Sequence, residues 1–166
     1  MNEANSADAS VQGRTKVERS DREIVVTRTF DAPAHLVYQA WTTSELFKRW
    51  WAPRSLGMNL RSVDLDVRTG GTYRLEFGED AANSMAFFGN YVEVIPNSKI
   101  VWTNDEGGEE GSVTTVTFEE QDGQTLLTMR EVYPSKEALE ANAGAEGALP
   151  EQFDQLDELL ASMAAD

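Results

Sequence analysis

Apolar and polar residues alternate through much of the chain, and this pattern predicts β-strands. The first strand, residues 23–30, is rich in β-branched side chains, which favour an extended backbone. Gly70-Gly71 and Asp122-Gly123 are turn signals of tight hairpins, and such short links require antiparallel pairing. We expect a β-bulge at Gly89. The later strands are expected at residues 60–67, 72–77, 85–95, 99–103, 112–120 and 124–132.

Helical spacing replaces the alternation directly after the first strand. Residues 33–41 carry apolar side chains three and four positions apart, as one face of a helix requires. Thr42 and Glu45 match a capping box, in which a hydroxyl is followed three residues later by a glutamate. The sequence therefore predicts a second short helix here, and Pro53 would end it.

The C-terminal part of the chain is expected to be helical again. Ser135 can cap a short helix, and residues 150–163 carry one continuous apolar stripe. This order predicts an α+β fold: a curved antiparallel sheet of about seven strands wrapped round a long C-terminal helix, with two short helices after the first strand. Residues 1–20 are too polar to repay the entropy of ordering, so we expect a disordered tail before a single domain of residues 21–166.

Composition and charge exclude several classes of function. The 166 residues include no cysteine and one histidine, which excludes disulfides, thiol nucleophiles and any site that needs two histidines. The formal net charge of −15 argues against nucleic acid and anionic membrane surfaces as partners. The N-terminus has neither the basic start nor the apolar stretch of a secretory signal, so a cytoplasmic protein is expected.

Seven short motifs, in this order and spacing, resemble the large helix-grip superfamily that includes START domains, polyketide cyclases and plant PR-10-like proteins. Within it, the chain is most similar to the family related to the C-terminal domain of the Hsp90 ATPase activator. The motifs are VTRTFDAP at 26–33, VYQAWT at 37–42, WWAP at 50–53, DVRTGGTY at 66–73, GNYVEVIP at 89–96, YPSKEA at 133–138 and FDQLDELL at 153–160.

A curved sheet that grips one helix can leave an apolar cavity between them, and large side chains are the candidates to line it. The same rings can instead fill the core, and this alternative stays open. Trp50 and Trp51 are adjacent on a helix, so one is expected to pack inward and the other to lie nearer a pocket mouth. The apolar candidate lining is Phe47, Trp50, Trp51, Tyr73, Leu75, Phe77, Phe88, Tyr91, Trp102, Phe153, Leu156 and Leu160.

Arg130 and Glu131 supply the candidate polar anchor of that cavity. They are neighbours on one strand, so one points inward and the other outward; a pair at the outer rim is the alternative. His35 is expected at the surface, and Asp64 and Asp66 in a charge ladder on the outer face, with no metal site. Residues 105–122 hold seven acids and no base, so a nearby pocket would favour a neutral or cationic guest.

These observations favour a monomeric protein that binds a small apolar or aromatic molecule, without a cofactor. The resemblance implies ligands of the lipid, polyketide or flavonoid type. It also leaves two alternatives, an enzyme of the polyketide cyclase or hydrolase kind and a module that binds an Hsp90-type chaperone. No acid–base pair or nucleophile motif in the sequence supports the enzyme, so binding is the leading hypothesis.

Overall fold

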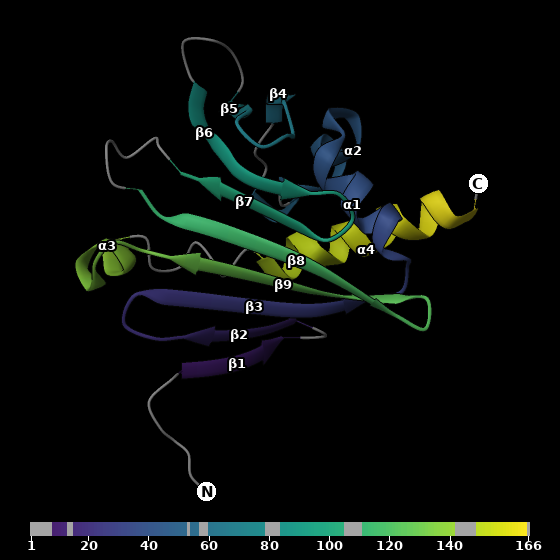
Figure 1. The fold of residues 1–166 in the computed structure, drawn as a ribbon, viewed down its shortest axis with the longest axis horizontal. Helices are drawn as coiled ribbons and strands as arrows, with labels where there is room; N and C mark the ends of the chain where they lie inside the picture. The colour runs from purple at the N-terminus through teal and green to yellow at the C-terminus, as the bar shows by residue number, and fades with distance from the viewer. Residues whose placement is uncertain are drawn as a thin grey trace, which may run out of the picture.

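A single antiparallel sheet organises the chain (Figure 1). The computed structural model describes residues 8–12, 15–52, 54–56, 60–78, 84–104, 111–141 and 149–165. Within these ranges the sheet has nine strands in the order β1-β2-β3-β9-β8-β7-β6-β5-β4. The strands are β1 (Asp8–Gln12), β2 (Thr15–Arg19), β3 (Glu23–Phe30), β4 (Leu60–Leu65), β5 (Thr72–Gly78), β6 (Ser84–Ile95), β7 (Lys99–Thr103), β8 (Val113–Gln121) and β9 (Gln124–Val132).

The α-helices lie where the apolar spacing predicts them, and a short 3-10 turn was not expected. They are α1 (Ala34–Thr42), α2 (Ser44–Trp50), a 3-10 turn η1 (Arg54–Leu56), α3 (Lys136–Ala141) and α4 (Leu149–Ala165). The α+β helix-grip fold is therefore confirmed, with a curved antiparallel sheet and a long C-terminal helix. No helix in the described ranges is both long enough and apolar enough to cross a bilayer.

The N-terminal segment differs from the expected tail. Residues 8–12 and 15–19 form β1 and β2, and β2 pairs with β3. Thr15 and Val17 are buried on the same face of β2. The segment carries few apolar side chains, so it is ordered mainly by backbone hydrogen bonds between β2 and β3. The sequence alone does not predict which strand it pairs with.

Two local expectations also differ from the structure. The capping box is not formed: Thr43 is the N-cap of α2 without a side-chain hydrogen bond, and the Thr42 hydroxyl donates to the Tyr38 carbonyl instead. The register shift in β6 lies between Tyr91 and Glu93 rather than at Gly89. Gly89 is needed for another reason, because a Cβ there would lie 1.9 Å from the Thr103 carbonyl oxygen.

The long strand β6 gives the sheet its curvature. Its first half pairs with β5 and its second half with β7, and the register shift separates the two halves. In Figure 1, β6 rises from the main sheet and carries β5 and β4 with it, while α1, α2 and α4 lie together on one side. Helix α4 packs against α2, α1 and β2, and α2 packs against β4. The concave face of the sheet is therefore the face that the helices cover.

A buried ion cluster fixes α4 to the sheet. Arg28 lies on the inner face of β3 and its side chain is almost fully buried. Its Nη1 donates to Asp154 Oδ1 at 2.8 Å and to Thr15 Oγ1 at 3.0 Å, and its Nη2 donates to Asp157. This guanidinium thus joins three elements, β2, β3 and α4.

Gln155 fixes α4 to the segment that follows α2. This buried amide donates to the carbonyls of Trp50 and Ala52, both at 2.9 Å, and accepts from the Arg54 backbone N–H at 2.9 Å. A short polar side chain on the apolar stripe of α4 therefore satisfies three backbone groups at the C-terminal end of α2.

Candidate functional site

All four tryptophans of the chain meet on the inner side of the sheet. We call Trp41, Trp50, Trp51 and Trp102 the tryptophan cluster. Trp41 of α1 is at its centre, with ring centroids 4.9 Å from Trp50, 5.9 Å from Trp51 and 5.9 Å from Trp102. The cluster therefore joins both short helices to strand β7.

The members of the tryptophan cluster differ in their contact with solvent. Trp41 and Trp50 are buried, with 3% and 0% of their surface exposed, whereas Trp51 and Trp102 are half-buried. Trp51 stacks on Phe47 with a centroid distance of 4.8 Å and an interplanar angle of 23°. Trp51 and Trp102 thus keep partial contact with solvent beside the buried Trp41.

A polar network borders the cluster and has Asn104 as its centre. Asn104 Oδ1 accepts from the Tyr73 hydroxyl at 3.1 Å and from Trp102 Nε1 at 3.3 Å. Asn104 Nδ2 donates to Ser112 Oγ at 2.9 Å and to Thr114 Oγ1 at 3.1 Å. One amide therefore links two aromatic rings, from β5 and β7, to the beginning of β8.

The network continues to a carboxylate. Ser112 Oγ donates to Glu131 Oε2 at 2.8 Å, and Glu131 is half-buried on the same face of β9 as the buried Met129. Its neighbour Arg130 is exposed on the opposite face and forms an ion pair with Glu23 of β3. Of the two charged residues that the sequence offers as an anchor, Glu131 is the one that lies on the inner side.

The other expected lining residues fall into three groups. Tyr73, Leu75, Phe77 and Tyr91 are buried on the inner face of β5 and β6. Trp50, Phe47, Phe153, Leu156 and Leu160 are buried where α2 and α4 pack together, as part of the core. Phe88 lies on the opposite, outer face of β6, opposite Arg74, and 38% of its surface is exposed.

The position of Phe88 has a simple cause. Side chains alternate along a strand, so Phe87 and Phe88 point to opposite faces. Phe87 packs edge-on against Phe77, with ring centroids 5.5 Å apart, and therefore takes the inner position that the sequence analysis assigned to Phe88.

Tyr91 shows how far water is excluded from the inner face of β6. Burial is the main cause that raises the pKa of its hydroxyl, and Asp66 and Tyr38 raise it further. Its ring centroid lies 5.7 Å from that of Tyr73. On the inner face, the Tyr91 side chain is therefore buried away from water. The Trp102 side chain, which is its partner in the sheet, is only half-buried.

The sequence analysis missed Asn104, Ser112 and Thr114. A signal was present, because Ser112, just before β8, and Thr114 begin the alternating row that continues as the buried Val116 and Phe118. Polar side chains in such a row must find partners on the inner side. The partner that holds them, Asn104, directly follows β7, the strand that pairs with β8, and spacing alone does not identify the contact.

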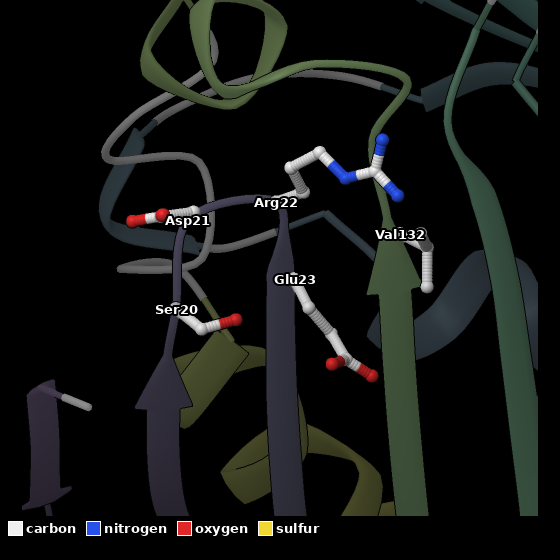
Figure 2. A pocket seen from close by; sticks show the side chains of 5 residues that line it. All are labelled: Ser20, Asp21, Arg22, Glu23 and Val132. Atoms are coloured by element: carbon white, nitrogen blue, oxygen red, sulfur yellow. The ribbon is translucent and has the colours of Figure 1, made fainter. Parts of the chain in front are cut away.

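A surface hollow of about 410 Å³ lies elsewhere, at the β2–β3 turn and the end of β9. Figure 2 shows Ser20, Asp21, Arg22, Glu23 and Val132 around it. Two of its three charged groups already have partners, since Arg22 Nη1 donates to the Pro134 carbonyl at 3.3 Å and Glu23 pairs with Arg130. We therefore place the candidate site at the tryptophan cluster and not here.

Comparison with known proteins supports this fold. The family model described as "Activator of Hsp90 ATPase homolog 1-like protein" matches residues 31–161. No curated protein matches the chain significantly.

Three solved structures illustrate the likeness. A Rhodobacter sphaeroides protein is 21% identical over 86% of this chain and 94% of its own, with a TM-score of 0.77. A Staphylococcus epidermidis protein is 26% identical over 89% of this chain and 94% of its own, with a TM-score of 0.73. An AHSA1-like protein from Aeromonas hydrophila is 18% identical over 81% of this chain and 92% of its own, with a TM-score of 0.64.

Proposed function

The chain belongs to the family of Activator of Hsp90 ATPase homolog 1-like proteins, and from this we propose that it binds a small, uncharged apolar or aromatic molecule between the concave face of the sheet and the helices. One observation carries the proposal: two half-buried rings, Trp51 and Trp102, each lie 5.9 Å by ring centroid from the buried Trp41. Large apolar rings that keep solvent contact beside a core are suited to receive a flat guest.

The energetics of this site favour an apolar guest. Burial of about 200 Å² of apolar surface contributes roughly 5 kcal/mol before the costs of ordering. Each well-placed aromatic pair adds about 0.5–1.5 kcal/mol beyond its buried area. With two such pairs these terms total about 6–8 kcal/mol, and after ordering costs are subtracted they predict binding weaker than micromolar.

Charge selects against anions. The chain carries a formal net charge of −15, and Glu131 lies on the inner side of the sheet near the tryptophan cluster through Ser112 and Asn104. An anionic guest would lose solvation and meet a negative potential, so a neutral guest is preferred and a cationic one is tolerated.

Titration with N-phenyl-1-naphthylamine, a neutral fluorescent probe, tests the proposal. We expect enhanced probe emission with quenching of tryptophan fluorescence, and amide shifts at Trp102 and Trp51 rather than on the outer face. Trp102→Ala should weaken binding about tenfold or more, because it removes one of the two half-buried rings that would contact the probe.

Phe88→Ala is the matched control, since it removes an exposed ring from the outer face of the same sheet. Its binding should equal that of the unaltered protein. Equal loss in both variants, or saturable shifts confined to the outer face, would show that the probe binds the surface and that the proposal is wrong.

A chaperone partner is the second candidate, and the family description is the observation that favours it. The test is the ATPase rate of an Hsp90-type chaperone with and without this protein. A rate that rises with a saturable dependence on its concentration supports this partner, and an unchanged rate removes it.

A further inference from the structure

Two buried side-chain nitrogens in the described ranges have no hydrogen-bond partner, Arg28 Nε and Trp41 Nε1. The Arg28 guanidinium is nevertheless held, because its two terminal nitrogens donate to Thr15, Asp154 and Asp157. An indole has one polar atom only, so the whole Trp41 ring makes no hydrogen bond. A buried donor without an acceptor destabilises the folded state, and such a group in a native protein calls for an explanation.

Two neighbouring rings of the cluster differ from Trp41, because their indole N–H groups have hydrogen-bond acceptors. Trp50 Nε1 donates to the Ala40 carbonyl at 3.0 Å, and Trp102 Nε1 donates to Asn104 Oδ1 at 3.3 Å. Both rings lie within 6 Å of Trp41 by centroid distance. The fold therefore supplies acceptors to two rings of the cluster and none to its central member.

Trp41 is buried but lies close to the two half-buried rings of the cluster. Its ring centroid lies 5.9 Å from that of Trp51 and 5.9 Å from that of Trp102. A flat molecule that inserts beside either of these rings comes next to Trp41. We propose that Trp41 Nε1 is the donor that recognises a neutral hydrogen-bond acceptor on the guest, and that the guest class is the planar aromatic carbonyl compound; this rests on the proposed function.

The chemistry of the site narrows the acceptor to a carbonyl. An indole N–H only donates, so the guest must accept. A carboxylate would accept as well, but it would be desolvated in a protein of net charge −15. A hydroxyl brings its own proton, which needs a further acceptor, whereas a ketone, quinone or amide carbonyl brings none.

A matched pair of ligands tests this inference. Fluorenone and fluorene have the same three-ring frame, and fluorenone has a carbonyl group where fluorene has a methylene. We expect fluorenone to bind the full chain about three- to tenfold more tightly, the usual net effect of one neutral hydrogen bond, as measured by calorimetry or fluorescence. Trp41→Phe should abolish this preference by weakening fluorenone alone.

Phe88→Ala is the control, because it removes an exposed ring from the outer face of the sheet, away from the tryptophan cluster. It should keep the preference for fluorenone. If Trp41→Phe does not fold, the Nε1 proton resonance of Trp41 in the unaltered protein gives the answer. Fluorenone should shift it downfield and slow its exchange, and fluorene should do neither.

The outcomes separate the two proposals. If both compounds bind equally at the tryptophan cluster, or Trp41→Phe keeps the preference, the carbonyl inference is wrong and the proposed binding function stands. If neither compound nor the naphthylamine probe binds at the cluster, both proposals are wrong.

Discussion

The ion cluster of Arg28 makes a quantitative prediction, because its two aspartates differ in exposure. The Asp157 side chain is 24% exposed and that of Asp154 is 67% exposed, while the Arg28 side chain that both contact is 2% exposed. Removal of one partner of a buried ion pair costs about 3–5 kcal/mol, since the other charge stays buried. Solvent-exposed pairs contribute about 1 kcal/mol or less.

We therefore expect Asp157→Ala to lower the free energy of unfolding by about 2–4 kcal/mol, a little below the full range because Asp154 and Thr15 still contact the guanidinium. Asp154→Ala should cost less than about 1 kcal/mol. A loss of the larger size is a large fraction of the stability of an ordinary domain.

Urea unfolding followed by far-UV circular dichroism measures both values, provided that the slope of the transition is unchanged. In 1 M NaCl the smaller effect should shrink and the larger one persist. In an Arg28→Met background, which removes the buried charge, Asp157→Ala should cost less than about 1 kcal/mol. Equal costs for the two aspartates, or an Asp157 effect that survives in the Arg28→Met background, would refute the view that the buried guanidinium causes the loss.

Three further predictions concern Gln155, Gly89 and Tyr91. Gln155→Leu should lower the free energy of unfolding by about 2–3 kcal/mol in the same urea assay, because buried backbone groups near Trp50 lose their partners, whereas a loss below 0.5 kcal/mol would contradict this. Gly89→Ala should unfold at a temperature at least about 5 °C lower by calorimetry, since a Cβ would lie 1.9 Å from the Thr103 carbonyl oxygen, and an unchanged midpoint would exclude that contact. Burial raises the pKa of Tyr91, so the unfolded chain releases this proton first and stability should fall as the pH rises above about 10. Tyr91→Phe should flatten that fall, and a curve of the same slope would show that Tyr91 is not its source.

Most of the fold could be predicted because its strands alternate clearly and are separated by strong turn residues. The strands at 99–103 and 124–132 were expected with the bounds that the structure has. Strands β1 and β2 could not be predicted, since β2 is ordered by pairing with β3 and β1 by pairing with β2 more than by their own apolar content.

The site could be predicted only in part, and the reason is the phase of each strand. Tyr73, Leu75 and Phe77 alternate with polar residues, so their shared inner face was clear. Phe87 and Phe88 are both apolar, and Arg130 and Glu131 are both charged, so spacing alone cannot decide which of each pair points inward.

The polar network required the tertiary structure. Asn104 holds Trp102 and Tyr73 through one side-chain amide, and these three residues are brought together by the pairing of β5, β6 and β7. No local signal in the sequence identifies such a contact.

The Asn104 amide also bears on the proposed binding function. Because its oxygen accepts hydrogen bonds from Trp102 and Tyr73, the rotamer entropy of both rings is lost on folding and would not be lost again when a guest of the proposed kind binds. This part of the proposed site is therefore preorganised, and adaptation to guests of different thickness would fall to Trp51, which stacks on Phe47. If related chains bind different molecules in this way, we expect their sequences to differ more on α2 than on the strands.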